Sequence, residues 1–252
     1  MKSLSASGFT IIEVMLVLAI SSLLTMGAVI GLSGSLNTQR YRDSVSSLQS
    51  LIQKQFSDVN NVSNSTSTLN CVVTAGVPAL TDSGGVSVSN GKTDCVILGK
   101  LITTQGGKTV FTYNVVGAVA SGSGDVDILK KSNIILNSVD VDSYDLEWGA
   151  SLKNTNGSIA NFSVLIVRSP ASGAIRTFIN PTVGVASSAD VATLRSLVTD
   201  GNGANLQNKL LVCVKSDGSI RSDRTAIFIK AGAASSSGVE TQGESTEPPT
   251  GC

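Results

Sequence analysis

The spacing of apolar and polar residues changes near residue 60. An uncharged apolar run over 14–32 comes first, and it is about as long as the roughly 20 residues that cross a bilayer as a helix. Apolar residues then recur at steps of three and four, which places them in one stripe along a helix. The stripe contains Tyr41, Val45, Leu48, Ile52, Phe56 and Val59. We predict one long helix over 9–60, with a membrane span at about 14–32 and an amphipathic second half that packs on a domain.

Beyond residue 60 the pattern changes to the period of two that is typical of strands. The polar segment 60–70 ends the helix, and three pairs of alternating segments with turn residues between them predict antiparallel hairpins. They cover 96–104 with 109–119, 161–169 with 173–179, and 209–215 with 219–230. The third hairpin turns at Asp217 and Gly218. The predicted fold class is α+β, with the long N-terminal helix carrying an antiparallel β-sheet domain.

Two smaller features complete the predicted domain. Residues 187–199 have the pattern of a short helix with a Ser cap and with Val191, Leu194 and Leu197 facing inward. The tail 233–252 is poor in apolar residues, so we expect it to be flexible up to its terminal cysteine.

Composition narrows the range of functions. Lys+Arg and Asp+Glu are both 18, so net charge gives no argument for a nucleic-acid partner. Only 14% of the residues are charged and 4% are aromatic, a composition that suits the exposed strands and turns of an extracytoplasmic domain. The chain has no histidine, which removes the usual general base and the commonest metal ligand. We therefore expect neither an enzyme nor a cofactor.

Four cysteines lie at positions 71, 95, 213 and 252, without metal-site spacing. In an exported domain an even number predicts two disulfides, with three possible connectivities. Local pairing is the simplest, and it joins Cys71 with Cys95 and Cys213 with Cys252. In a reducing compartment all four would be free thiols.

An acidic segment, residues 138–149, invites comparison with a calcium site, because Asp140, Asp142, Asp145 and Glu147 supply oxygen ligands. Strand alternation places Asp140 and Asp142 on one face, which favours a solvated strand over a metal site. We predict no metal there.

Glu13 interrupts the apolar N-terminal segment, and no further charge follows it until Arg40. A carboxylate at the centre of a membrane helix costs about 2.5 to 3.5 kcal/mol, so an intramembrane acid is by default a functional hypothesis. The alternative is a glutamate at the end of the span, solvated near the headgroups and without a role.

The sequence GFTIIE, Gly8 to Glu13, followed by an apolar helix, resembles the prepilin signature of bacterial type IV pilins and type II secretion pseudopilins. The resemblance covers roughly residues 2–59. It implies that a prepilin peptidase cuts between Gly8 and Phe9 and methylates the new amino group of Phe9. It also implies that Glu13 sets the assembly register, by lying beside the Phe9 amino group of a neighbouring subunit.

The resemblance implies a leader peptide over 1–8, the helix over 9–60, an exported β-rich domain over 61–232 and the tail over 233–252. The expected function is a structural subunit of a type IV pilus-like filament, a fimbrium. Its partners would be other pilin subunits, the peptidase, an inner-membrane assembly platform and a cytoplasmic ATPase, with membrane lipid around the helix before assembly. The chain would be a single-pass membrane protein first and part of an extracellular pilus afterwards.

Two alternatives remain open at this point. The chain could be a pseudopilin in the periplasmic pseudopilus of a type II secretion system, or a membrane-anchored adhesion or binding domain that never polymerises. No specific nucleic acid is expected as a partner in any of these cases.

Overall fold

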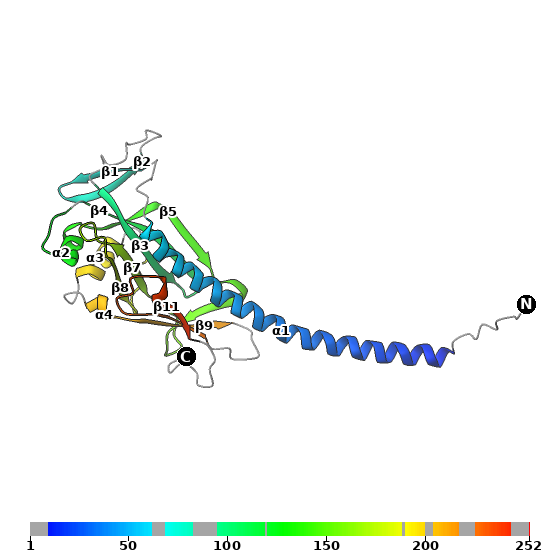
Figure 1. Cartoon of the computed structure of the whole chain (residues 1–252). Coiled ribbons are helices and arrows are strands. Elements are labelled where there is room, and N and C mark those ends of the chain that lie inside the picture. The colour runs from blue at the N-terminus through cyan, green and yellow to red at the C-terminus, as the bar shows by residue number, and fades with distance from the viewer. Residues whose placement is uncertain are drawn as a thin grey trace, which may run out of the picture.

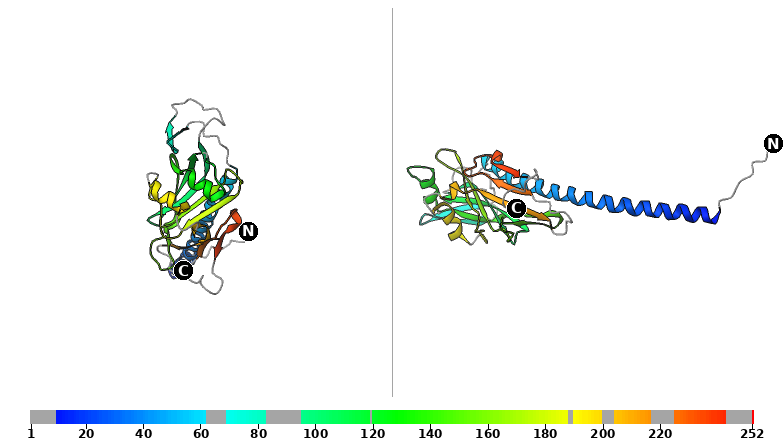
Figure 2. Two further views of the ribbon diagram at one scale, coloured as in Figure 1. Left: turned by 90° about the vertical axis from the view of Figure 1, so that its left-hand side faces the viewer. Right: turned by 90° about the horizontal axis from the view of Figure 1, so that it is seen from below.

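The computed structural model describes residues 10–61, 69–82, 95–118, 120–187, 190–199, 204–216, 225–242 and 252. A long helix projects from a β-rich domain that also contains the C-terminal residue (Figure 1). The two further views show the same projection, with the domain packed along the C-terminal half of the helix (Figure 2). The predicted α+β fold is confirmed.

Helix α1 covers Ile11–Asn60 in one uninterrupted stretch of 50 residues. All six residues of the predicted stripe are buried, and none is more than 5% exposed. Its last turn is held from two sides, because the Asn61 N–H donates to Ser57 O and Arg168 Nη1 donates to Asn60 O at 3.3 Å. The amphipathic half therefore forms part of the domain, as the periodicity predicts.

The domain contains eleven described strands in three antiparallel sheets. The strands are β1 Leu69–Thr74, β2 Val77–Asp82, β3 Cys95–Gln105, β4 Thr109–Ala118, β5 Ile135–Asp145, β6 Ala150–Lys153, β7 Ser163–Arg168, β8 Ile175–Asn180, β9 Leu210–Ser216, β10 Thr225–Ile229 and β11 Val239–Gln242. The sheet orders are β1-β2, β11-β10-β9-β6 and β5-β4-β3-β7-β8.

Short helices connect these strands. They are α2 Asp125–Lys131, α3 Val191–Thr199 and α4 Ala204–Gln207, with 3-10 turns η1 Glu147–Gly149 and η3 Ser236–Gly238. The three predicted hairpins appear as β3-β4, β7-β8 and β9-β10. The first two share the five-stranded sheet and the third belongs to the four-stranded one. The turn predicted at Asp217 and Gly218 lies outside the described residues.

The five-stranded sheet is covered on both faces, and β7 shows the consequence most clearly. Val164 and Ile166 belong to the apolar core that includes the buried stripe of α1, while Leu165 and Val167 belong to a second core with residues of α2 and α3. Successive side chains of a strand point to opposite faces, so a strand buried on both faces is apolar throughout. The order of layers is therefore α1, the sheet, and then α2 with α3.

The predicted helix over 187–199 is shorter in the structure. It begins at Val191, and its cap is an aspartate instead of a serine, since Asp190 Oδ1 accepts the Thr193 N–H at 3.2 Å. Leu194 and Leu197 are buried as predicted, but Val191 is only half-buried and Val198 is buried instead. Asp is as good an N-cap as Ser, and Val198 lies four residues after the buried Leu194, on the same face of the helix.

The predicted flexible tail is wrong for its first half. Val239–Gln242 form β11, which pairs with β10, and Val239 is 2% exposed. Gln49 and Gln53 of α1 donate to Val239 O at 3.5 and 3.3 Å. Low apolar content does not exclude a strand here, because β11 is held by backbone pairing with β10 and by the two glutamines more than by its own side chains. Residues 243–251 lie outside the described part.

The terminal residue is fixed covalently, because Cys252 forms a disulfide with Cys213 of β9. Their Cα atoms are 5.6 Å apart, within the usual range for such bridges. Cys95 is also disulfide-bonded. The side chain of Cys71, its predicted partner, lies outside the described residues.

Replacing Cys213 and Cys252 together with alanine is expected to lower the free energy of unfolding by about 2 to 4 kcal/mol, because the open chain gains entropy when unfolded. Denaturant unfolding of the detergent-solubilised protein measures this loss. Under reducing conditions the variant and the unmodified chain should have the same stability. A difference that persists after reduction would assign the effect to side-chain packing at Cys213.

Asp125 joins the start of α2 to the turn between β7 and β8. Ser169 Oγ donates to Asp125 Oδ1 at 2.7 Å, and Arg176 Nη2 donates to Oδ2 at 3.1 Å. Hydrogen bonds from Ser169 and Ser172, with a smaller contribution from Arg176, hold the pKa of Asp125 below its ordinary value. The ionised carboxylate is thus favoured in the folded protein, and this stability is lost as pH falls through the lowered pKa.

We expect Asp125→Asn to be less stable than the unmodified chain at neutral pH and the difference to shrink below about pH 4, where the carboxylate becomes protonated. Thermal unfolding at a series of pH values tests this. Asp142→Asn is the matched control, since Asp142 is an exposed carboxylate on β5. A stability difference for Asp125→Asn that does not depend on pH would contradict the ionic role.

Candidate functional site

The sequence predicts an assembly residue in α1, Glu13, and a cleavage site before it at Gly8 and Phe9. Of these, Gly8 and Phe9 lie outside the described residues, and Glu13 is exposed in the first turn of the helix. Thr10 caps the helix: its backbone is extended, and its Oγ1 accepts the Glu13 N–H at 3.3 Å. A carboxylate in the first turn also interacts favourably with the positive end of the helix dipole.

This geometry gives Glu13 a second candidate role that the sequence analysis missed. Thr10 and Glu13 have the spacing of a capping box, in which an N-cap Ser or Thr is followed three residues later by Glu or Gln. The spacing alone could have indicated it. Glu13 therefore has a candidate local role at the helix start and a candidate role between subunits, and an experiment has to separate the two.

The N-terminal half of α1 exposes an unusually large apolar surface. Residues Ile11–Val29 are long and apolar enough to span a membrane, with a mean hydropathy of 2.1, and none of this segment is buried within the protein. The large exposed side chains are Ile11, Ile12, Val14, Met15, Leu16, Val17, Leu18, Ile20, Leu23, Leu24, Met26 and Val29. Soluble proteins rarely leave such a surface in water. Lipid or other apolar helices must therefore cover it.

The few hydroxyl groups in this segment fit an apolar environment. Ser22 Oγ donates to Ala19 O, and Thr25 Oγ1 donates to Ser21 O, each at 2.9 Å. Such bonds satisfy the hydroxyl within its own helix, so no partner in the surroundings is needed. Glu13 is the only charged residue between the start of α1 and Arg40.

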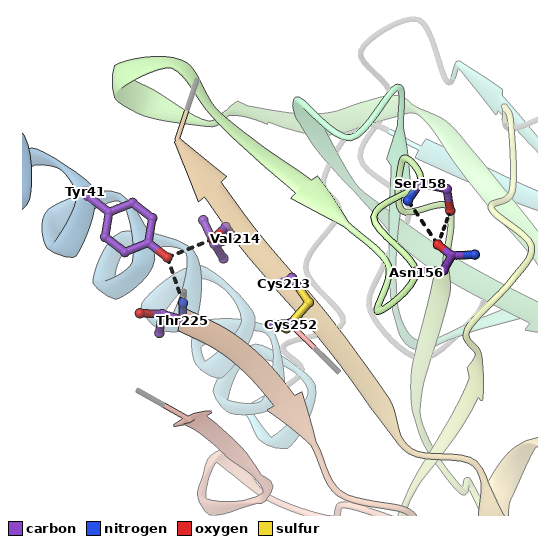
Figure 3. Close-up of a disulfide and its surroundings, with 7 residues drawn as sticks. All are labelled: Tyr41, Asn156, Ser158, Cys213, Val214, Thr225 and Cys252. Atoms are coloured by element: carbon purple, nitrogen blue, oxygen red, sulfur yellow. Dashed lines mark hydrogen bonds between the residues drawn. A yellow bond between two sulfur atoms is a disulfide. The ribbon is translucent and has the colours of Figure 1, made fainter. Parts of the chain in front are cut away.

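Tyr41 fixes the point where α1 enters the domain. Its hydroxyl donates to Val214 O of β9 and accepts the Thr225 N–H of β10, both at 2.8 Å (Figure 3). One side chain thereby bridges two neighbouring strands beside the Cys213–Cys252 disulfide. Sequence periodicity identified Tyr41 as a core residue, but nothing in the sequence indicated its hydrogen bonds.

The acidic segment 138–149 does not form a metal site in the part of the structure that is described. Asp142 and Asp145 are exposed on β5, and Thr109 Oγ1 donates to Asp145 Oδ1 at 2.6 Å. Within the described residues, no group of three or more His, Cys, Asp or Glu side chains could hold a metal ion. The side chain of Asp140 is outside that part.

One helix thus joins the unburied apolar segment to the folded domain. A rigid helix carries Glu13 and an exposed apolar surface at one end and is packed into a folded domain at the other, so the position of the domain follows the position of the helix. Comparison with models of known protein families, with curated protein sequences and with solved structures gives no match for this chain.

Proposed function

We propose that this protein is a structural subunit of a type IV pilus-like filament, made as a prepilin and polymerised through α1. The observation that supports this most is the division of one continuous helix into an unburied apolar half and a half that is packed into an antiparallel sheet domain. A simple anchor needs only the span. Continuing the same helix through the domain couples the domain rigidly to the helix, as assembly of a regular filament requires.

Glu13 gives the filament its register in this proposal. In the bundle of α1 helices at the filament centre, the Glu13 carboxylate of one subunit lies beside the methylated Phe9 amino group of the next. Opposite charges attract strongly where water is scarce, and a charge left without its partner is heavily penalised. Only a neighbour at the correct axial position satisfies both groups.

Before assembly, the apolar half of α1 spans the inner membrane with the domain outside the cytoplasm. Prepilin peptidase removes residues 1–8, and an assembly platform with its ATPase draws subunits from the bilayer into the filament. In this proposal the filament is an extracellular pilus. A pseudopilin would use the same helix, so the two are distinguished by whether filaments sheared from the cell surface contain this chain.

The proposal is tested at the amino terminus. Mass spectrometry of the chain from its native host is expected to find N-methylated Phe9 as the first residue. Replacing Gly8 with valine is expected to leave the precursor uncut in the membrane, because a small residue is needed at the cleavage site, whereas Ser5→Val should be processed normally. A native chain that retains residues 1–8 would rule out a prepilin.

A further inference from the structure

Where α1 leaves the domain, the guanidinium carbon of Arg40 lies over the ring of Trp148, 4.6 Å from the ring centroid. Trp148 is the only tryptophan in the chain, and it is 52% exposed although tryptophan usually buries most of its surface. Arg40 is exposed too, and it directly precedes Tyr41, the first buried residue of the stripe. The predicted function does not use this pair.

The backbone at Trp148 is unusual. It has φ 58° and ψ 31°, in the left-handed region that residues other than glycine seldom adopt. Gly149 follows with φ 70°. This corner connects β5 of the five-stranded sheet to β6 of the four-stranded one, and η1 contacts α1. The fold thus holds a large aromatic side chain outward in a costly conformation, close to the membrane-spanning half of the helix.

The position of the pair along α1 matches the thickness of a bilayer. No charge lies between Glu13 and Arg40. The helix from Val14 to Arg40 is about 39 Å long at about 1.5 Å per residue, and a tilt of about 20° shortens its projection to about 37 Å. A hydrocarbon core of about 30 Å plus one headgroup layer of about 5 to 7 Å has nearly the same thickness.

The chemistry of the pair suits phospholipid headgroups. Tryptophan concentrates at membrane interfaces, because its ring is apolar and its N–H is polar. A guanidinium presents five N–H donors, and those of Arg40 can donate to a phosphate. The ion pairs among the described residues do not include Arg40. Asp43 is the exposed acid nearest to Arg40 in sequence, and Glu147 is the one nearest to Trp148.

We propose that Trp148 and Arg40 form an interfacial anchor, which rests on the phospholipid headgroups of the outer leaflet and fixes the height and tilt of the domain before assembly. The inference depends on the membrane-spanning stage of the proposed function, but not on polymerisation. In this proposal the two side chains contact the headgroup layer of the bilayer in which α1 is inserted. The competing possibility is that they contact a neighbouring subunit.

The test uses the fluorescence of Trp148 in the full-length chain, reconstituted in phosphatidylcholine nanodiscs. Lipids brominated near the carbonyl end of the acyl chain are expected to at least halve the emission, and lipids brominated near the methyl end to quench it less. Arg40→Glu should abolish most of this quenching, because its carboxylate is repelled by the phosphates. Arg42→Glu is the control with the same charge change on another face of α1, and it should be quenched like the unmodified chain.

Three results would overturn the inference. The first is emission that brominated lipid does not quench in a chain shown to be inserted by resistance to carbonate extraction; the second is equal quenching in Arg40→Glu. The third is that Trp148 becomes shielded from acrylamide only when the chain is in filaments. That result would assign the pair to a contact between subunits. Cleavage by prepilin peptidase is measured separately in the same nanodiscs. A chain that is inserted and cut but not quenched refutes only the interfacial anchor. A chain that is quenched but not cut refutes only its assignment as a prepilin.

Discussion

A Glu13→Val chain is expected to enter the membrane, lose its leader and fold its domain normally, yet to be absent from filaments. The substitution makes the span more apolar, so insertion is not impaired. In the filament core, however, the amino group of Phe9 would lose its counter-charge. Breaking one side of a buried ion pair costs about 3 to 5 kcal/mol, and the loss recurs at every subunit contact. Immunoblots of sheared filaments and of membranes measure the assembled and the unassembled protein.

Two further variants separate the candidate roles of Glu13. Glu13→Gln removes the charge, but its side chain can still complete a capping box with Thr10. We expect it to fail in assembly as Glu13→Val does, and wild-type assembly of Glu13→Gln would assign the residue to the helix cap. Thr25→Val is the control for making the span more apolar, since the hydrogen bonds that the described residues give the Thr25 hydroxyl are to Ser21 O and Ser22 O of α1 itself. It should assemble normally.

The second large effect is expected from Phe56→Ala. Phe56 is 1% exposed in the core between α1 and the two larger sheets. Removing a buried phenylalanine side chain typically costs about 3 to 5 kcal/mol, because apolar contact is lost and a cavity remains. The free energy of unfolding of the detergent-solubilised chain should fall by about this amount.

Lys54→Ala is the matched control for Phe56→Ala, because Lys54 is exposed on the same turn of α1. It should change stability by less than about 0.5 kcal/mol. If Phe56→Ala is no less stable than this control, the second half of α1 is not part of the domain core. Helical content measured by circular dichroism distinguishes loss of the helix itself from loss of its packing.

The sequence was most informative where a periodic pattern reports burial directly. The stripe on α1 is buried as its spacing predicts, and the paired segments form the predicted hairpins β3-β4 and β7-β8, although β7 is buried on both faces and not on one. Elements that are stabilised by contacts with residues distant in sequence were not predicted. β11 has one buried side chain in four and depends on β10 and two distant glutamines, and α2 is seven residues long and is tied to the β7-β8 turn through Asp125.

The same distinction applies to the candidate functional residues. Glu13 is conspicuous in the sequence because a charge in an apolar run is anomalous without any knowledge of the fold. Arg40 and Trp148 are each unremarkable in sequence, and only the corner between two sheets brings them together. Likewise, Tyr41 follows the apolar period, but its hydroxyl bridges strands that lie far away along the chain.

The Cys213–Cys252 disulfide has a consequence for a chain under tension. If the protein is pulled between α1 and its last residue, force passes from Cys213 directly to Cys252, and the segment between them carries none. The sequence separation is 39, so about 130 Å of extended chain stays hidden when the domain unravels. Strands β10 and β11 are within this closed loop. Reduction would release that length, and the oxidised protein is therefore the less extensible of the two.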